Sequence, residues 1–173
     1  ADRSTVEKLD SDLTTVLDTI NLAQPFIQGV NMPWMSYGYD IGIATLGTET
    51  GEHFGFSSSD GFKALADKLQ QHQGDYVRVF LFGDLRAGVA FDASGNPTVF
   101  TSKVYEDMQA LIDLAEMLGV KLLPVLLDFK MADGVSTEGS VQVGEHADII
   151  TEGVGPGSKA ETLISLLGDF VNN

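Results

Sequence analysis

The fold of this chain is decided by the stretch Tyr76-Val-Arg-Val-Phe-Leu-Phe-Gly-Asp84. Six of these nine residues are aromatic or aliphatic, and Gly83 ends the run. A short apolar run bounded by turn residues predicts a strand buried on both faces, as in parallel sheets covered by helices. Arg78 is the exception, because an unpaired buried charge costs several kcal/mol. Two interpretations stay open for it: a structural ion pair or edge position, and a cation that orients carboxylates in an active site.

Two further apolar stretches predict strands that pair with this one, Phe26–Asn31 and Lys121–Leu127. Pro124 places the second of them at a bulge or beside a missing partner, because proline removes a backbone donor from the ladder. Apolar residues at helical spacing predict helices around the strands. The predicted helices cover Thr5–Leu22, Ser59–Gln73, Ser102–Leu118 and Ser158–Val171.

Polar residues mark the starts of three of these helices. Ser57-Ser-Ser-Asp60 supplies serine caps and an acid for the first turn, and Ser158-Lys-Ala-Glu161 has the pattern of a capping box. Thr101 or Ser102 is expected to cap the helix between them. Helices that alternate with apolar strands predict an α/β fold with crossover connections and a parallel sheet. The long loops of this sequence all follow predicted strands. We therefore expect the functional site at the carboxyl ends of the strands.

The composition bounds the class of protein and its partners. The 173 residues are enough for one domain, and 43% hydrophobic with 20% charged residues predicts a folded chain. A net charge of −15 argues against nucleic acid and anionic membrane surfaces as partners, and it fits a secreted protein, a saline habitat or a chain that binds cations. The chain has no cysteine, so no disulfide or thiolate chemistry is expected, and we expect no cofactor.

The loop after the first predicted strand carries aromatic residues with polar tips. They are Trp34, which is the single tryptophan of the chain, Tyr37 and Tyr39. Aromatic rings at the exit of a strand suit the apolar faces of sugars. The alternative is that Trp34 and Tyr37 plug the end of the core.

Two later insertions also follow strands. Val89–Phe100 predicts a small β-hairpin around Ser94-Gly95-Asn96, although Asp92, Ser94 and Asn96 alternate like the first oxygen ligands of a calcium loop. No acidic residue completes that calcium loop at the right distance, so a plain turn is the preferred interpretation. Residues 129–157 are expected to form a long glycine-rich loop.

The three predicted strands contain the motifs Gly29-Val-Asn-Met-Pro-Trp34, Arg78-Val-Phe-Leu-Phe82 and Leu122-Leu-Pro-Val-Leu-Leu-Asp128. In this order they resemble the first three strands of a retaining glycoside hydrolase of the large clan with a TIM barrel, the cellulase and mannanase type. In that clan the first strand commonly contains G-x-N, the second an arginine and the third a run like PVLLD. The resemblance covers roughly residues 26–173. It implies a partial (β/α)8 barrel of about three βα units with an N-terminal helix, as a single domain over residues 1–173.

The same resemblance implies roles for individual residues. Arg78 matches the arginine that holds the nucleophilic carboxylate, and Trp34 and Tyr37 match loop positions that often line sugar subsites. The family's acid/base glutamate follows an asparagine after the fourth strand, and its nucleophile lies on the seventh. This sequence contains no Asn-Glu dipeptide and ends before a fourth strand, whereas a complete barrel needs about 250 residues. We therefore expect no catalytic residue of the family in this chain.

Retaining hydrolysis needs two carboxyl groups about 5–5.5 Å apart. Asp84 with Asp128, or Glu145 with His146, could substitute for the missing glutamates, but nothing in their spacing distinguishes them from solvated loop residues. We expect no metal site. We expect the substrate-binding residues to be Asn31, Trp34, Tyr37, Tyr39, Arg78, Asp84, Asp128 and His146.

Three hypotheses for function follow. The first is a glycoside-hydrolase-like segment that binds carbohydrate and needs a partner segment for hydrolysis. The second is a carbohydrate-binding or structural module without catalysis. The third is a shortened α/β scaffold that completes its sheet by pairing with a copy of itself, since open sheet edges and an uncovered apolar face mark an interface. A secreted or extracytoplasmic location is the expected one.

Overall fold

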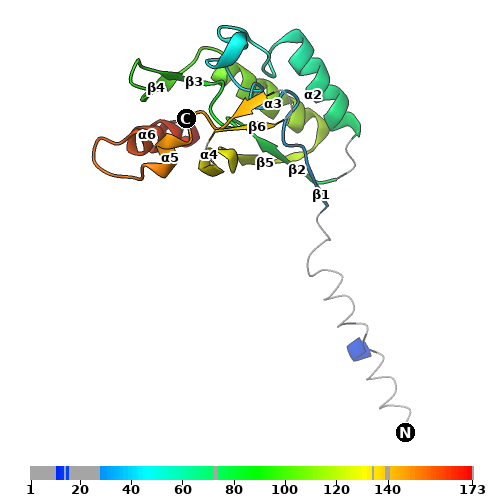
Figure 1. Cartoon of the computed structure of the whole chain (residues 1–173). Coiled ribbons are helices and arrows are strands. Elements are labelled where there is room, and N and C mark those ends of the chain that lie inside the picture. The colour runs from blue at the N-terminus through cyan, green and yellow to red at the C-terminus, as the bar shows by residue number, and fades with distance from the viewer. Residues whose placement is uncertain are drawn as a thin grey trace.

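The computed structural model describes residues 11–13, 15, 28–71, 74–133, 135–138 and 141–172. Their centre is a three-stranded parallel sheet in the order β1 (Gly29–Asn31), β2 (Tyr76–Phe80) and β5 (Lys121–Val125) (Figure 1). The predicted parallel sheet is confirmed, although β2 and β5 each end two residues earlier than expected. The predicted helix Thr5–Leu22 and the first residues of the predicted strand Phe26–Asn31 lie largely outside the described residues.

Two crossover helices connect the three strands. The helix α2 (Ser59–Gln71) lies between β1 and β2, and α3 (Val104–Leu118) lies between β2 and β5. Both bury leucines in one core with Val77 and Val79 of β2. The α/β class is therefore confirmed, since helices and parallel strands alternate along the chain.

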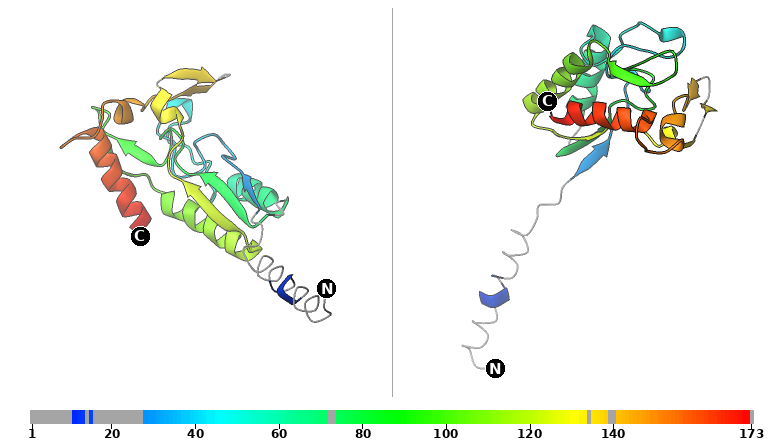
Figure 2. Two further views of the ribbon diagram at one scale, coloured as in Figure 1. Left: turned by 90° about the horizontal axis from the view of Figure 1, so that it is seen from below. Right: turned by 90° about the vertical axis from the view of Figure 1, so that its left-hand side faces the viewer.

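The remaining elements belong to the insertions and to the C-terminal helix. The predicted hairpin is confirmed as β3 and β4, and the helix α6 packs against it through Phe170, whose ring contacts Phe82 and Phe100. The expected long loop after β5 is wrong, because that segment folds into two short helices and an antiparallel hairpin, β6–β7, at the periphery of the molecule (Figure 2). Elements of three or four residues are too short to show a hydrophobic period. The short elements are η1 (Gly47–Glu49), β3 (Val89–Phe91), β4 (Pro97–Phe100), α4 (Lys130–Asp133), β6 (Ser136–Glu138), β7 (Val141–Val143) and α5 (Asp148–Thr151). The C-terminal helix α6 is longer and covers Lys159–Asn172.

The helix starts follow the sequence signals in two cases out of three. The Ser58 hydroxyl accepts the Gly61 backbone N–H at 3.1 Å, and the Ser158 hydroxyl accepts the Glu161 N–H at 3.1 Å. The helix α3 has neither predicted cap: it begins after Lys103, a residue with φ of +82°, and no side chain caps it. The Thr101 hydroxyl instead accepts the Ile43 N–H at 2.9 Å, because the neighbouring loop packs there.

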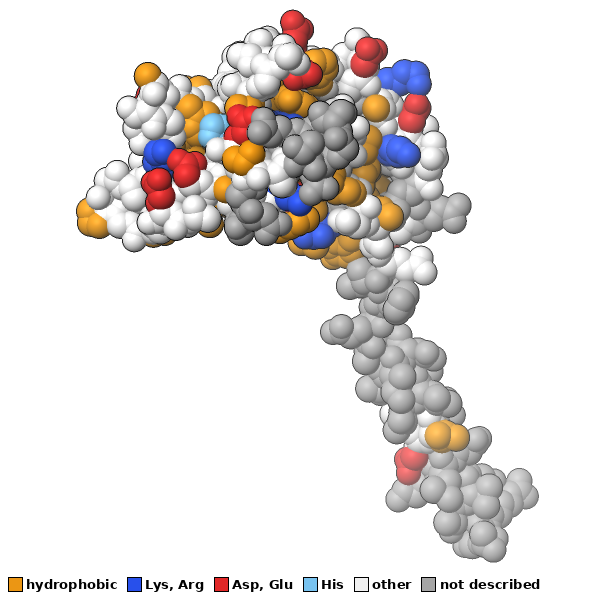
Figure 3. Space-filling view, viewed as in Figure 1, with side chains coloured by type: hydrophobic (Ala, Val, Ile, Leu, Met, Phe, Trp, Pro, Cys, Tyr) orange, Lys and Arg blue, Asp and Glu red, His pale blue; other side chains and the backbone are white. Residues whose placement is uncertain are grey.

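One face of the sheet is open, which overturns the prediction that β2 is buried on both faces. Arg78 is exposed, its guanidinium lies 4.5 Å from the centre of the Phe80 ring, and Leu123 beside it on β5 is 55% exposed. Figure 3 shows hydrophobic side chains at the surface over this lower part of the sheet. Arg78 therefore needs no buried ion pair.

Pro124 lies on an edge strand, as one of its two interpretations required. In the described sheet β5 pairs only with β2. The Lys121 N–H donates to Asp75 O, and Val125 O accepts from Leu81, so the odd-numbered residues of β5 face β2. The position of Pro124 faces the open edge, where the missing N–H removes no bond from the ladder.

Candidate functional site

A continuous row of side chains crosses the open face of the sheet to the carboxyl ends of the strands. We call it the rim row and define it as Phe80, Trp34, Tyr37 and Asp128. The Phe80 and Trp34 ring centres are 5.3 Å apart, and those of Trp34 and Tyr37 are 4.6 Å apart in an edge-to-face contact. The Tyr37 hydroxyl then donates to Asp128 Oδ2 at 3.3 Å. The row joins residues from all three strand exits.

Local backbone geometry places the row. The β2–β5 ladder continues past the strands, because the Asp128 N–H donates to Gly83 O at 2.9 Å. Gly83 has φ of +51°, and a Cβ built there would lie 3.0 Å from the Gly38 Cα and 3.8 Å from the Trp34 indole nitrogen. Trp34 and Asp128 therefore flank the same glycine, whose missing side chain lets the loop of Tyr37 approach the sheet.

Two polar atoms of the rim row are buried without a hydrogen-bond partner among the described residues. They are the Trp34 indole nitrogen and Asp128 Oδ1, and Asp128 as a whole is only 3% exposed. An unsatisfied buried donor or acceptor costs about 1–3 kcal/mol, and such exceptions call for an explanation. Burial raises the pKa of Tyr37, and the charges of Asp84 and Asp128 raise it further, so its phenol stays a neutral donor. One N–H donor and one carboxylate acceptor of the rim row are thus buried and unpaired among the described residues.

Asp84 and Arg86 form a buried ion pair behind the row. Arg86 Nε and an outer guanidinium nitrogen donate to the two Asp84 oxygens at 2.7 and 2.6 Å, and the Gly144 N–H donates to Asp84 at 3.0 Å. The guanidinium lies over the Tyr37 ring at 4.6 Å and over the Tyr39 ring at 5.4 Å. The arginine that holds a carboxylate in this structure is therefore Arg86, which the sequence analysis did not select, and Asp84 has no exposed surface for a ligand.

The other predicted site residues lie around this pair. Tyr39 donates to Glu49 at 3.4 Å, and its pKa is raised chiefly by burial. His146 stacks on Phe91 with ring centres 3.9 Å apart, and its Nε2 is buried without a partner among the described residues. Burial lowers the pKa of His146, so the imidazole is neutral near pH 7.

Asn31 and Arg78 extend the row down the open sheet face. They are paired neighbours on β1 and β2, both exposed, and an Arg78 guanidinium nitrogen lies 3.4 Å from Asn31 Oδ1. With Gly29, Val30, Tyr76 and Leu123 they line a shallow groove of about 240 Å³. Contacts along the open sheet face therefore join five of the eight predicted residues, with Phe80 as the link: Asn31, Arg78, Trp34, Tyr37 and Asp128. Asp84 and Tyr39 are connected to Tyr37 through Arg86, and His146 lies on the third insertion.

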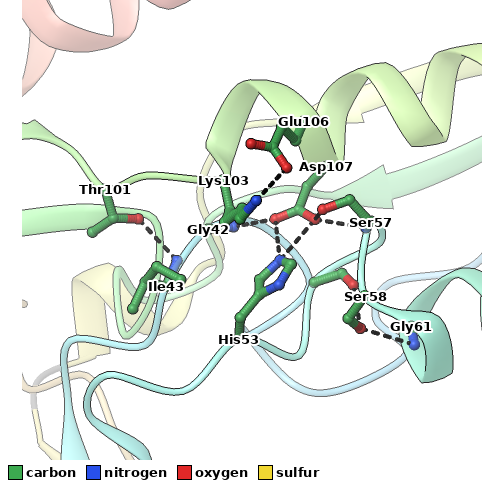
Figure 4. Close-up of polar contacts among 11 residues, drawn as sticks. Gly42, Ile43, His53, Ser57, Ser58, Gly61, Thr101, Lys103, Glu106 and Asp107 are labelled. Atoms are coloured by element: carbon green, nitrogen blue, oxygen red, sulfur yellow. Dashed lines mark hydrogen bonds and ion pairs between the residues drawn. The ribbon is translucent and has the colours of Figure 1, made fainter.

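Sequence reasoning missed a second polar cluster, centred on Asp107 of α3 (Figure 4). Asp107 is fully buried and accepts the Gly42 N–H at 2.7 Å, the Ser57 N–H at 2.7 Å and the Ser57 hydroxyl at 2.6 Å. His53 Nε2 lies 3.0 Å from the same carboxylate. The signal was present, because Asp107 follows Val104 by three residues and precedes Leu111 by four on the buried helix face.

Asp40 is another buried carboxylate, and it lies in the loop after β1. It accepts the Met35 N–H at 2.7 Å and the Ser36 N–H at 2.8 Å. Burial raises the pKa of Asp40 to about 6, against the lowering effect of these two hydrogen bonds. Asp40 and Asp107 together fix the loop that carries Trp34, Tyr37 and Tyr39.

The segment around Asp92, Ser94 and Asn96 forms a turn, which was the preferred interpretation of it. Asp92 accepts the backbone N–H groups of Ser94 and Asn96 at 2.8 and 2.9 Å, and the Asn96 side-chain amide at 2.9 Å. These bonds lower the pKa of Asp92, with the Asn96 side chain the largest cause. The structure finds no group of three or more metal-ligating side chains in the part of the chain it describes. No helix in that part is long and apolar enough to span a bilayer.

Comparison with known proteins places the fold. No family model matches the chain, and no curated protein matches it. A β-mannanase from the blue mussel Mytilus edulis superposes with a TM-score of 0.56 at 19% identity, over 80% of this chain and 34% of that one. A β-1,4-D-mannanase from Cryptopygus antarcticus matches at 30% identity with a TM-score of 0.47, over 62% of this chain and 28% of that one. An endo-1,4-β-mannanase from Eisenia fetida matches at 19% identity and a TM-score of 0.49, over 65% and 29%.

The superposition on the mussel protein confirms the predicted fold. The chain resembles part of a glycoside hydrolase with a TIM barrel, and its three parallel strands with their helices form a partial barrel-like α/β fold. The chain spans about a third of the length of the solved mannanases it matches.

Proposed function

We propose that the rim row binds a sugar unit of a carbohydrate. The observation that carries this proposal is the pair of buried, unpartnered atoms, the Trp34 indole N–H and Asp128 Oδ1. A sugar hydroxyl is both a donor and an acceptor, so it matches such a pair, and the half-buried Trp34 ring offers an apolar face to the ring carbons. Asn31 and Arg78 supply further polar contacts along the open face.

Asp84 has a positioning role in this proposal. Its oxygens are engaged by Arg86 and Gly144, and Arg86 in turn supports the Tyr37 ring from behind. Tyr37 then holds Asp128 through its hydroxyl. His146 lies near Asp84, and its neutral, unpartnered Nε2 is a further acceptor or donor for the same ligand.

Hydrolysis belongs to an assembly larger than these three βα units. The exposed Leu123 and the open groove beside Arg78 favour further strands that cover this face, because apolar surface of this kind marks an interface. We propose that a second protein segment or another copy supplies that cover, and that the catalytic carboxylates come with it. A secreted location and a single domain over residues 1–173 stay predictions.

Binding to oligosaccharides tests this proposal. The names of the three matched structures make mannotriose the first probe, with cellotriose as a second. We expect mannotriose to bind the 173-residue chain in calorimetric titration and Trp34→Ala to weaken binding about tenfold or more, with no reducing sugar released. Tyr105→Ala is the matched control, since Tyr105 is an exposed aromatic residue on α3. Equal affinity of the Trp34 and Tyr105 variants would contradict the proposal.

A further inference from the structure

A pocket of about 440 Å³ lies beside the segment that carries Trp34 and Tyr37, but neither of these residues lines it. Met35 and Ser36 form one wall. The residues facing them come from the loop before α2 and from the first turns of that helix: His53, Phe54, Ser59, Asp60 and Ala64. Residues 34–37 thus supply two different surfaces, the rim row and this pocket.

Two buried carboxylates hold the pocket walls in place. Asp40 fixes Met35 and Ser36 through their backbone N–H groups, and Asp107 fixes His53. No side chain fits at Gly55, where a Cβ would overlap the Asp107 carboxylate. Burying carboxylates without a lysine or arginine partner is expensive, and here backbone N–H groups of the walls compensate both carboxylates. Walls that are held in this way lose little freedom on binding.

The chemistry of the pocket favours an uncharged ligand with many hydroxyl groups. His53 lines the pocket and donates through Nε2 to the Asp107 carboxylate, so Nδ1 is the ring nitrogen that Asp107 does not engage. Ser59 supplies a hydroxyl, and Phe54 is 39% exposed and offers a ring face. The Asp60 carboxylate and the net charge of −15 oppose an anion such as phosphate.

We propose that this pocket is a second carbohydrate subsite, which binds one sugar ring between Phe54 and the side chains of His53, Ser59 and Asp60. The choice of a sugar rests on the proposed function of the rim row. The pocket itself is argued from its own walls, so it can be tested separately from the row. The segment 34–37 would then separate two neighbouring sugar units of one chain or two independent ligands.

Amide chemical shifts of the isotope-labelled 173-residue chain distinguish the two sites. We expect mannotriose to shift the Phe54 and Gly61 amides as well as the Trp34 indole N–H. Phe54→Ala and Asp60→Asn should each weaken the effect at Gly61 about tenfold and leave the Trp34 titration unchanged. Asp67→Asn is the matched control, because Asp67 lies on the exposed side of α2 and pairs with Lys63.

Other outcomes overturn one proposal or the other. Shifts at Trp34 with none at the pocket amides would reject the second subsite and leave the rim row intact. Shifts at the pocket amides with none at Trp34 would reject the proposed function and keep the pocket. Pocket shifts with inorganic phosphate and none with mannotriose would replace the sugar subsite by an anion site. Loss of the Gly61 shift in Trp34→Ala would show a single site.

Discussion

Asp107 and Asp128 are both buried carboxylates, and they differ in what surrounds them. Asp107 accepts from Gly42, Ser57 and His53, so both of its oxygens are satisfied. Asp128 accepts one hydrogen bond through its side chain, from Tyr37 at 3.3 Å, and its other oxygen has no partner among the described residues. A satisfied buried carboxylate holds the fold together, whereas an unsatisfied one is maintained at a cost to stability. The difference separates a structural residue from a candidate ligand contact.

The largest effect is expected at Asp107. Asp107→Ala leaves the Gly42 and Ser57 donors and His53 buried without their acceptor. We expect it to lower the free energy of unfolding by about 3 kcal/mol in urea denaturation. Asp113→Asn on the exposed side of the same helix is the control and should change little. An equal loss in both variants would remove the contrast between Asp107 and Asp128.

Asp40 is a third buried carboxylate, and its effect on stability should depend on pH. Its pKa is raised to about 6 in the folded chain, so folding favours the protonated form. The stabilisation is fully present below the unfolded pKa near 4 and is lost as pH rises through 6. The free energy of unfolding of Asp40→Asn, relative to the unsubstituted chain, should therefore increase by about 2 kcal/mol between pH 4 and pH 7. A flat difference across this range would show that Asp40 is ionised throughout.

Weakening the ion pair between Asp84 and Arg86 should have an intermediate effect on stability. Arg86→Lys keeps the charge but cannot reproduce the two parallel bonds to Asp84 or the contact with the Tyr37 ring. We expect a loss of about 2 kcal/mol in stability and weaker mannotriose binding, because Tyr37 loses its support. Arg78→Lys, on the exposed face, is the control for stability. If the two lysine variants were equally stable, Arg86 would have no special role.

The sequence was sufficient for the sheet and for most helix boundaries, because apolar runs and serine caps act locally. The strands around Val77 and Leu122 and the caps Ser58 and Ser158 follow from residues within a few positions of them. The cap of α3 could not be predicted, because Thr101 binds Ile43, which is 58 residues away. Contacts at such separation leave no local pattern.

The candidate site was predictable as a location and less so as a set of contacts. Trp34, Tyr37 and Asp128 were selected because each follows a strand, and the structure brings them into direct contact. The sequence pointed to Arg78 as the arginine that holds a carboxylate, whereas Arg86 does so in the structure. This difference could not be foreseen, because it depends on which face of β2 is covered. Asp107 shares the buried helix face with Val104 and Leu111, but its hydrogen-bond partners Gly42, Ser57 and His53 lie 65, 50 and 54 residues away, so no local pattern shows what the carboxylate does.

The smallest change in stability, and the most direct test, belongs to Asp128→Asn. We predict that this variant is as stable as the unsubstituted chain or more stable by up to about 1 kcal/mol, because it removes a buried carboxylate with one unsatisfied oxygen. The same variant should bind mannotriose about tenfold more weakly, because Asp128 Oδ1 no longer accepts as a carboxylate. Unfolding and titration on one preparation give both values. A variant that is destabilised by several kcal/mol and binds mannotriose with unchanged affinity would show that Asp128 is structural, like Asp107, and that it does not contact the ligand.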